Sequence, residues 1–237
     1  MDKYPLITQK RADFELFKQV IYLMLEQQHL TLSGLAKIAN IKASMNFEVL
    51  SDSLQSKFPN IKPVNRPLVD PELEIYDLNW VSGFAEGESC FFVNIYKRKD
   101  SVLGEGVKLV FKITQDQRNN GILTKLIKTF SCGKVYNQSS KVKVQDFMVT
   151  GLTDIIERII PFFYAHPLQG AKKEEFEDFV KVAELMKSKA HLTREGRRGV
   201  TSLHLASPWN KQVYFFGLEQ VYKIKEKSVR KGGYFLL

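Results

Sequence analysis

The stretch "LNWVSGFAEGESCFFVNIYKRK", residues 78–99, places two acidic residues where a helical pattern changes into a strand pattern. Before Glu86 the apolar residues have helical spacing, and after Glu88 the run "CFFVNIY" is typical of a strand. A carboxylate at such a junction belongs either to an exposed helix end or to a functional site. Because the helix macrodipole disfavours negative charge at a C-terminus, this position favours a bound cation near Glu88.

The composition bounds the class of protein. The chain has 237 residues, of which 44% are hydrophobic, so it can bury a core as one or two domains. We expect no membrane partner, because no apolar run reaches the length of a transmembrane helix, and the N-terminus shows no signal core. Cys90 and Cys132 are too few for a disulfide framework or a four-ligand zinc site, which indicates a reducing compartment.

The net charge of +9 indicates a polyanionic partner, but its distribution leaves a second interpretation open. Residues 187–231 hold 11 Lys or Arg against 3 acidic residues, so most of the excess lies near the C-terminal end. A basic segment of this kind either binds phosphate groups or is simply solvated. The charge alone does not distinguish between these two interpretations.

An internal repeat is the strongest sign of organisation. Residues 4–34 align with residues 166–196 at an offset of 162, with identical residues at 13 of 31 positions. Both copies place apolar residues at helical spacing and end in "HLT", which indicates a helix that stops and restarts. We therefore interpret the two segments as duplicated helical units, and the recurring His29 and His191 as structural residues near a helix end rather than as a metal pair.

The second copy follows an alternating run of helices and strands. Residues 90–98 and 107–114 are expected to be strands, 119–130 a helix, and "GKVYN" and "KVKVQDFMVT" a further strand pair. A helix over "LTDIIERIIPFFYAH" contains Pro161, an unusual position for this residue. The expected organisation is helices of a truncated first repeat over 1–60, a Pro-rich connector over 61–76, a complete second repeat over 77–196, and a basic tail over 197–237.

The segment "WVSGFAEGESCF" resembles the signature of LAGLIDADG homing endonucleases, of the two-repeat type carried in organellar introns. Reading the nine letters from Val81 to Ser89 places the family's metal-binding acid at Glu88, and Ser89 departs from the usual glycine. Other segments match in the same order, over roughly residues 1–195: "YPLITQKRADFELFKQV", "FPNIKPVNRPLV", "LVFKITQ", "CGKVY", "DFMVT" and "IIPFF". The resemblance implies an α+β fold with a helix-strand-strand-helix-strand-strand-helix unit and an antiparallel, saddle-shaped DNA-binding sheet.

The resemblance also implies a role for each part of the motif. Glu88 would be the catalytic residue and a ligand of Mg²⁺ or another divalent cation, whereas Glu86 would stand outside the first metal shell. Gly83 and Gly87 lie four residues apart on one helix face and would allow close approach of a second motif helix. The implied function is a site-specific, metal-dependent DNA endonuclease, or the C-terminal part of one, that makes double-strand breaks by phosphodiester hydrolysis.

The alternation of the strands defines a candidate DNA-binding face. One face is apolar and is expected to pack beneath helices, and the other is mixed polar, aromatic and basic. On pattern alone an ordinary solvated face fits equally well, and the resemblance favours contact with the major groove of double-stranded DNA. The candidate DNA-binding residues are Cys90, Phe92, Asn94, Tyr96, Arg98, Lys108, Lys112, Thr114, Lys134, Lys141 and Lys143.

A two-repeat protein of this family carries one motif in each repeat. Over residues 1–77 we find no second acid-terminated helix like the one at Val81–Ser89, so the motif of the first repeat is missing. Three states are compatible with this pattern: a part whose missing N-terminal half is supplied elsewhere, a homodimer formed through the motif helix, or an inactive remnant. The alternative functions are an intron RNA maturase and a nucleic-acid-binding protein without nuclease activity. The resemblance to organelle-encoded proteins implies a mitochondrial location.

Overall fold

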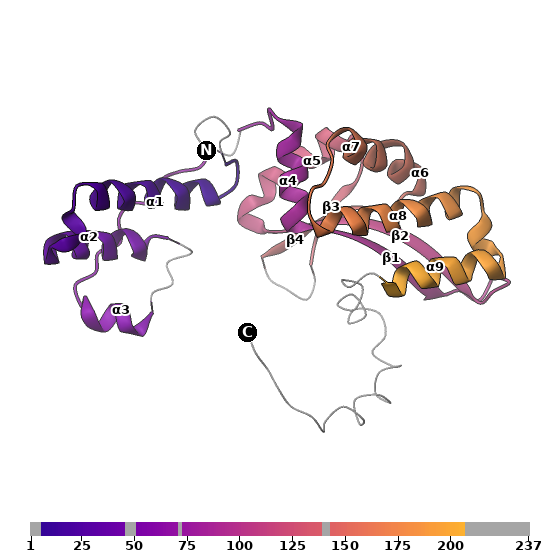
Figure 1. Ribbon diagram of the computed structural model, residues 1–237, viewed down its shortest axis with the longest axis horizontal. Coiled ribbons are helices and arrows are strands. Elements are labelled where there is room, and N and C mark those ends of the chain that lie inside the picture. The colour runs from indigo at the N-terminus through magenta and orange to yellow at the C-terminus, as the bar shows by residue number, and fades with distance from the viewer. Residues whose placement is uncertain (1–5, 46–50, 71–72, 139–142, 207–237) are drawn as a thin grey trace, which may run out of the picture. The chain divides into compact units, whose positions relative to one another are not determined.

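The computed structural model describes residues 6–45, 51–70, 73–138 and 143–206, and it has the expected α+β architecture (Figure 1). In chain order its elements are α1 Lys10–Leu25, η1 Gln28–Leu30, α2 Leu32–Ala43, α3 Asp52–Lys57, α4 Leu78–Glu88, β1 Ser89–Lys97, β2 Glu105–Asp116, η3 Gln117–Asn119, α5 Asn120–Phe130, β3 Lys134–Asn137, β4 Val144–Val149, α6 Leu152–Asp154, η4 Ile155–Ile159, α7 Ile160–Ala165, α8 Ala171–Lys187, η5 Ala190–Leu192 and α9 Arg194–Ala206. The predicted helices and strands are therefore present, with ends shifted by a few residues.

The four strands form one sheet in the order β1-β2-β4-β3. Strands β1 and β2 are antiparallel, with Ser89 opposite Ile113 at one end and Lys97 opposite Glu105 at the other. This hairpin follows directly from helix α4, so the last residue of the helix, Glu88, immediately precedes the first paired residue of the sheet.

The apolar face of the β1–β2 hairpin is filled by aromatic rings. The centroid of the Phe91 ring lies 4.9 Å from the centroid of the Phe111 ring. It lies 5.4 Å from the ring centroids of Phe163, Phe176 and Phe179. These last three rings come from α7 and α8, which lie along the same side of the hairpin (Figure 1). Period-two alternation of apolar residues thus positions the hairpin beneath its helices, as predicted.

The chain forms two compact units. One holds residues 1–81, 114–129 and 135–147, and the other holds residues 82–113, 130–134 and 148–237. The first unit contains α1–α3, and the connector at 61–70 and 73–76 has no helix or strand where it is described. The second unit contains the β1–β2 hairpin as far as Ile113, together with α8 and α9.

The repeated "HLT" segments form the same helix restart in both units. The Thr31 hydroxyl accepts a hydrogen bond from Gly34 N at 3.0 Å, and Thr193 accepts from Gly196 N at 3.1 Å. A Cβ added at Gly34 would lie 1.8 Å from the carbonyl oxygen of the preceding turn, and one at Gly196 would lie 2.0 Å from its equivalent. The recurring glycine is required by this close approach.

The two repeated histidines lie in the short 3-10 turns η1 and η5. His191 Nδ1 is 3.2 Å from the carbonyl oxygen of Leu185 at the end of α8. The residues before these turns, Gln27 and Lys189, both have positive φ, at 55° and 60°. The histidines thus belong to a repeated helix-ending turn, in agreement with their structural interpretation.

Two features differ in detail from the expected pattern. The helix around Pro161 is divided into α6, a π-helical turn at Ile155–Ile159 and α7, and the wider turn accommodates a ring that would clash with the carbonyl four residues earlier. Helix α9 crosses residue 196, so the start of the expected tail is helical, and residues 207–237 lie outside the described part. Within the described residues no helix has the length and apolar character needed to cross a membrane.

Candidate functional site

Glu88 is the last residue of α4, and its side chain is exposed at the junction with β1. The next residue, Ser89, is buried and begins the sheet opposite Ile113. The backbone direction at Glu88 is therefore fixed on both sides, by the helix before it and by the strand after it. Its charge lies at the negative end of the α4 macrodipole, where a cation would relieve the unfavourable interaction.

The donor set around Glu88 fits a metal ion only in part. Among the residues that the structure describes, no group of three or more His, Cys, Asp or Glu side chains gathers to hold a metal. Mg²⁺ at phosphate-processing sites is held by one or two carboxylates together with phosphate oxygens and water. Glu88 fits the role of one such carboxylate, and phosphate oxygens and water would supply further ligands.

One face of α4 is open at its two glycines. Gly83 and Gly87 are exposed, and a Cβ built on either would meet no atom within 4 Å. The helix therefore tolerates side chains here as the chain stands. Two glycines four residues apart are characteristic of helices whose backbones approach each other closely.

The second face of the β1–β2 hairpin carries six of the candidate binding residues. Cys90 pairs with Lys112 and Asn94 pairs with Lys108, so polar and basic side chains stand opposite each other. Asn94, Tyr96 and Lys108 are exposed, whereas Lys112, Cys90 and Phe92 are half-buried. The register thus brings these six together on one face, as the alternation predicted.

This face is mixed in character, as the sequence pattern suggested, and its middle is apolar. Val110, opposite Phe92, is only 3% exposed, which leaves an apolar patch in the middle of the face. Tyr96 lies across Gly106, where an added Cβ would come within 2.5 Å of the ring. Any ligand of this surface would therefore meet polar groups near the site of Glu88 and towards the hairpin end, with apolar contacts between them.

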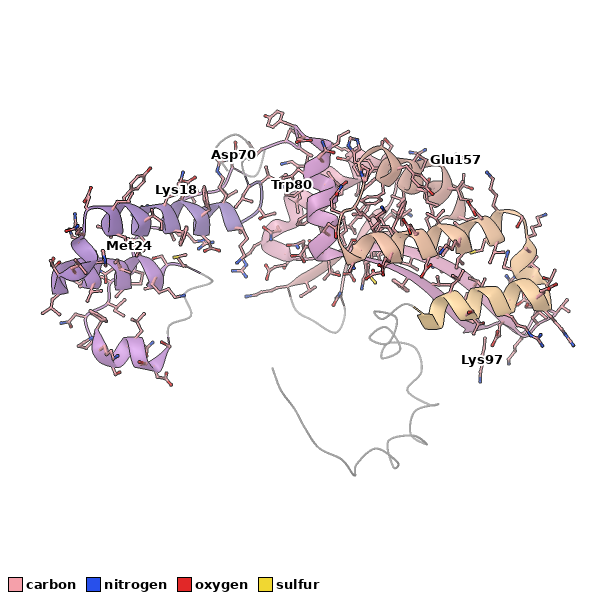
Figure 2. All side chains as sticks on the ribbon, viewed as in Figure 1. Lys18, Met24, Asp70, Trp80, Lys97 and Glu157 are labelled. Carbon is pink, nitrogen blue, oxygen red and sulfur yellow. The ribbon has the colours of Figure 1, made fainter. Side chains whose placement is uncertain are left out.

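Arg98 lies just beyond the end of β1, and its charge is paired within the turn. Its Nε is 3.1 Å from Asp100 Oδ1, and its Nη2 is 2.9 Å from Asp100 Oδ2. These hydrogen bonds raise the pKa of Arg98 and lower the pKa of Asp100. Both groups are solvent-exposed, so the pair is weak and could exchange for a phosphate contact. Lys97, at the end of β1, is labelled in Figure 2.

The first unit positions two further candidates. Thr114 Oγ1 donates to Asp146 Oδ1 at 2.5 Å, and Gln138 Nε2 donates to the same carboxylate at 2.9 Å. The Thr114 hydroxyl hydrogen is therefore already used in a local network. Lys143 is exposed with φ of 74°, and its carbonyl oxygen accepts from Gln117 N at 2.8 Å.

Lys134 begins β3 and is exposed, whereas Lys141 lies outside the described residues. Asp146, only 8% exposed, was not singled out from the sequence. Its position between Gln145 and the apolar run "FMV" was the one available signal.

A buried ion pair beside Cys90 was also missed. Lys172 Nζ is 2.9 Å from Glu175 Oε2, with side chains 13% and 4% exposed. Burial raises the pKa of the Cys90 thiol, the positive charge of Lys172 opposes that rise, and Glu175 adds to it. The repeat contained the signal, because Lys10 stands at the position of Lys172 and lies 3.6 Å from Asp13.

Comparisons with known proteins show which family the chain is similar to. A family model described as LAGLIDADG endonuclease matches residues 81–183. The "Probable intron-encoded endonuclease 3" of Neurospora crassa is 38% identical over 203 residues, which cover 86% of this chain and 38% of that protein. The chain spans less than half the length of the first two curated relatives it matches.

Solved structures show the same similarity. The I-LtrWI LAGLIDADG homing endonuclease bound to target DNA is 42% identical with a TM-score of 0.80, covering 88% of this chain and 69% of that one. I-SmaMI bound to uncleaved DNA target in the presence of calcium ions is 38% identical with a TM-score of 0.80, covering 85% of this chain and 68% of that one.

Proposed function

The chain belongs to the LAGLIDADG endonuclease family, and from this premise we propose that it forms the Glu88-bearing part of a site-specific DNA endonuclease. Such an enzyme makes a double-strand break by hydrolysing phosphodiester bonds. The observation that carries the proposal is the exposed carboxylate of Glu88, fixed at the junction of α4 with a hairpin whose second face presents Lys108, Lys112 and Asn94. The intron-encoded relatives support a mitochondrial origin.

Glu88 is the residue that would hold a divalent ion such as Mg²⁺, together with phosphate oxygens of the DNA. When bound, Mg²⁺ polarises the phosphate and lowers the pKa of a coordinated water. Glu88 contributes one negative charge and a fixed direction. The lysines of β2 contribute charge that holds the DNA backbone, and Asn94 offers the donor and acceptor pair that can read a base edge.

The described residues provide one such carboxylate, whereas cleavage of both strands in this family uses two. We propose that the second comes from another LAGLIDADG half. Gly83 and Gly87 support this, because they leave the motif helix open to a close neighbour. A leucine or phenylalanine at either position would hold a second helix away.

A comparison of α1 with α8 indicates what kind of partner is required. Phe17 is 50% exposed, whereas its repeat equivalent Phe179 is 1% exposed. Ile21 is 37% exposed, whereas the equivalent Ala183 is 1% exposed. In α8 this face covers Phe91 of β1, with the Phe179 ring 5.4 Å away. The same face on α1 therefore fits a second sheet of the same kind.

This contrast supports a separate half rather than a homodimer. In a second copy of this chain the apolar side of the hairpin is already covered by its own α7 and α8. A homodimer could therefore pair the motif helices but would leave the α1 face of each copy uncovered. A partner that brings an uncovered sheet would cover the α1 face, which a second copy of this chain does not do.

The proposal is tested by separating DNA binding from DNA cleavage. A target is first selected from random duplexes by binding to the chain, then cloned into a supercoiled plasmid and incubated with magnesium, with and without the unmatched part of I-LtrWI supplied as a candidate partner. Glu88→Gln keeps the side-chain shape and removes the charge, so cleavage should be abolished while the Kd for DNA changes by less than about threefold. Glu157→Gln, on an exposed turn labelled in Figure 2, is the matched control.

Robust linearisation by Glu88→Gln would rule out Glu88 as the essential carboxylate. Linearisation by a demonstrably monomeric wild-type chain would contradict the requirement for a second half. Binding to structured RNA with no binding to duplex DNA would replace the proposed function with an RNA-binding one.

A further inference from the structure

Glu86 joins the motif helix to the start of α8 across more than eighty residues of sequence. Its Oε1 accepts hydrogen bonds from the backbone N–H of Gln169 and from that of Gly170, the latter at 3.0 Å. Gly170 is the N-cap residue of α8 and has no side chain with which to cap the helix. The carboxylate also lies at the positive end of the α8 macrodipole, where negative charge is stabilised.

The approach of the two segments is close at this point. A Cβ added at Gly170 would lie 3.1 Å from Glu86 Oε2, so a side chain there would displace the carboxylate. One helical turn earlier, Ser82 Oγ donates to the carbonyl oxygen of His166 at 2.6 Å. Ser82 and Glu86 are on the same face of α4, so together they bind that face to residues 166–170.

These contacts bracket Glu88. Two residues before it, Glu86 is held by the start of α8, and one residue after it, Ser89 is held by the β2 strand. Gly83 and Gly87 lie on a different, neighbouring face of α4, where an added Cβ would meet no atom within 4 Å, so that face remains available to a partner helix. All the groups involved belong to the same compact unit.

We propose that Glu86 is a positioning residue, which sets the direction of Glu88 through its bonds to Gln169 and Gly170. Glu86 does not itself contact the reacting atoms. The two glutamates of "EGE" therefore have separate roles, one anchoring the helix end and the other presenting its charge to the cation. This inference rests on the proposed function, because it assigns Glu88 to a divalent ion.

The first measurement examines the anchor itself and needs no DNA or partner. Amide hydrogen exchange and amide chemical shifts of Gln169 and Gly170 are recorded in the full chain and in Glu86→Gln. Loss of the charged acceptor should speed exchange at these two amides by about 10-fold or more. Glu88→Gln and Glu157→Gln should leave the same two amides unchanged.

The second measurement examines the consequence for Glu88. Mn²⁺ is titrated into each variant in the presence of a selected DNA duplex, and paramagnetic broadening of the Glu88 and Ser89 amides reports the ion. Glu86→Gln should weaken Mn²⁺ binding by about 10-fold, in the range found when residues that orient metal ligands are removed. Glu86→Asp retains the charge and should recover part of this loss, whereas Glu88→Gln should abolish the broadening.

The outcomes separate the two ideas. If the exchange rates and chemical shifts of the Gln169 and Gly170 amides are the same in Glu86→Gln, Glu86 does not hold the start of α8. If those exchange rates and shifts change while the Mn²⁺ concentration at half-saturation does not, the contact is merely structural and the positioning role is wrong. Persistent broadening in Glu88→Gln would instead refute the assignment of Glu88, and with it the proposed function.

Discussion

Substitution of Arg66 by alanine should lower the free energy of unfolding of the unit that contains α1–α3, because this side chain bonds the connector to α1 and to the end of α2. Its Nη1 is 2.6 Å from Asp13 Oδ1 and 2.8 Å from the carbonyl oxygen of Ser44. Its Nη2 donates to the carbonyl oxygen of Gln9 at 3.0 Å. Arg66→Ala therefore removes three hydrogen bonds and leaves the Asp13 carboxylate, only 10% exposed, with less compensation.

The size of the effect follows from the burial of the pair. Removing one partner of a buried ion pair costs about 3–5 kcal/mol, since the other charge is left desolvated. Arg66 is 23% exposed, and Lys10 Nζ, 3.6 Å from Asp13, retains part of the compensation. We therefore expect a loss of about 3 kcal/mol in the free energy of unfolding of this unit, at the lower end of that range.

The assay is hydrogen exchange, because two compact units need not unfold in one transition. Amides of α1 and α2 should exchange about 100-fold faster in Arg66→Ala, while those of α8 should not change. Arg98→Ala removes an arginine from a solvent-exposed pair and should leave all of these rates unaltered. A change of less than about threefold in α1 and α2 would refute the reasoning, because it would mean that the buried pair contributes little.

Three further predictions concern packing, the partner face and cysteine reactivity. Phe111→Ala should lower the free energy of unfolding of the second unit by about 3–5 kcal/mol, since this fully buried ring has its centroid 4.9 Å from that of Phe91; a loss below about 1 kcal/mol, measured by hydrogen exchange of β1 and α8, would contradict the packing. Gly83→Ala should stabilise the isolated chain by about 0.5–1 kcal/mol, because its Cβ meets no atom within 4 Å, yet weaken association with a second half in sedimentation experiments. Equal association would contradict the partner face. Burial raises the pKa of Cys132 to about 11, so alkylation at pH 8 should be at least about 100-fold slower in the native protein than in urea, and similar rates would refute its protection.

The features predicted correctly from sequence are those with a local cause. The period-two spacing of Phe91 and Val93, together with the apolar residues of β2, indicated which face of β1 is buried, because side chains of a strand point to opposite sides. The repeated "HLT" predicted the helix restart, because the threonine cap and the glycine approach are both local. Glu88 was placed correctly at a helix end by the change of hydrophobic period alone.

The features missed depend on residues that are far apart in the chain. Nothing near Glu86 indicates that Gln169 and Gly170 will donate to it, because that contact exists only once the start of α8 reaches α4. Asp146 is satisfied by Thr114 from a neighbouring strand, so its burial could not be read from its own segment. Val110 lies on the same face as Lys108 and Lys112 yet is buried, because period-two alternation assigns a residue to a face without fixing its exposure.

The most direct test of the proposed function is a crystal structure of the chain with a selected DNA duplex and Ca²⁺, with the unmatched part of I-LtrWI added if the chain alone does not crystallise. The proposed function predicts a calcium ion about 2.3–2.6 Å from a carboxylate oxygen of Glu88 and bound also to a DNA phosphate oxygen. It further predicts that the duplex lies on the face of Asn94 and Lys108. A duplex on that face with no cation at Glu88, or a duplex bound elsewhere on the chain, would contradict it.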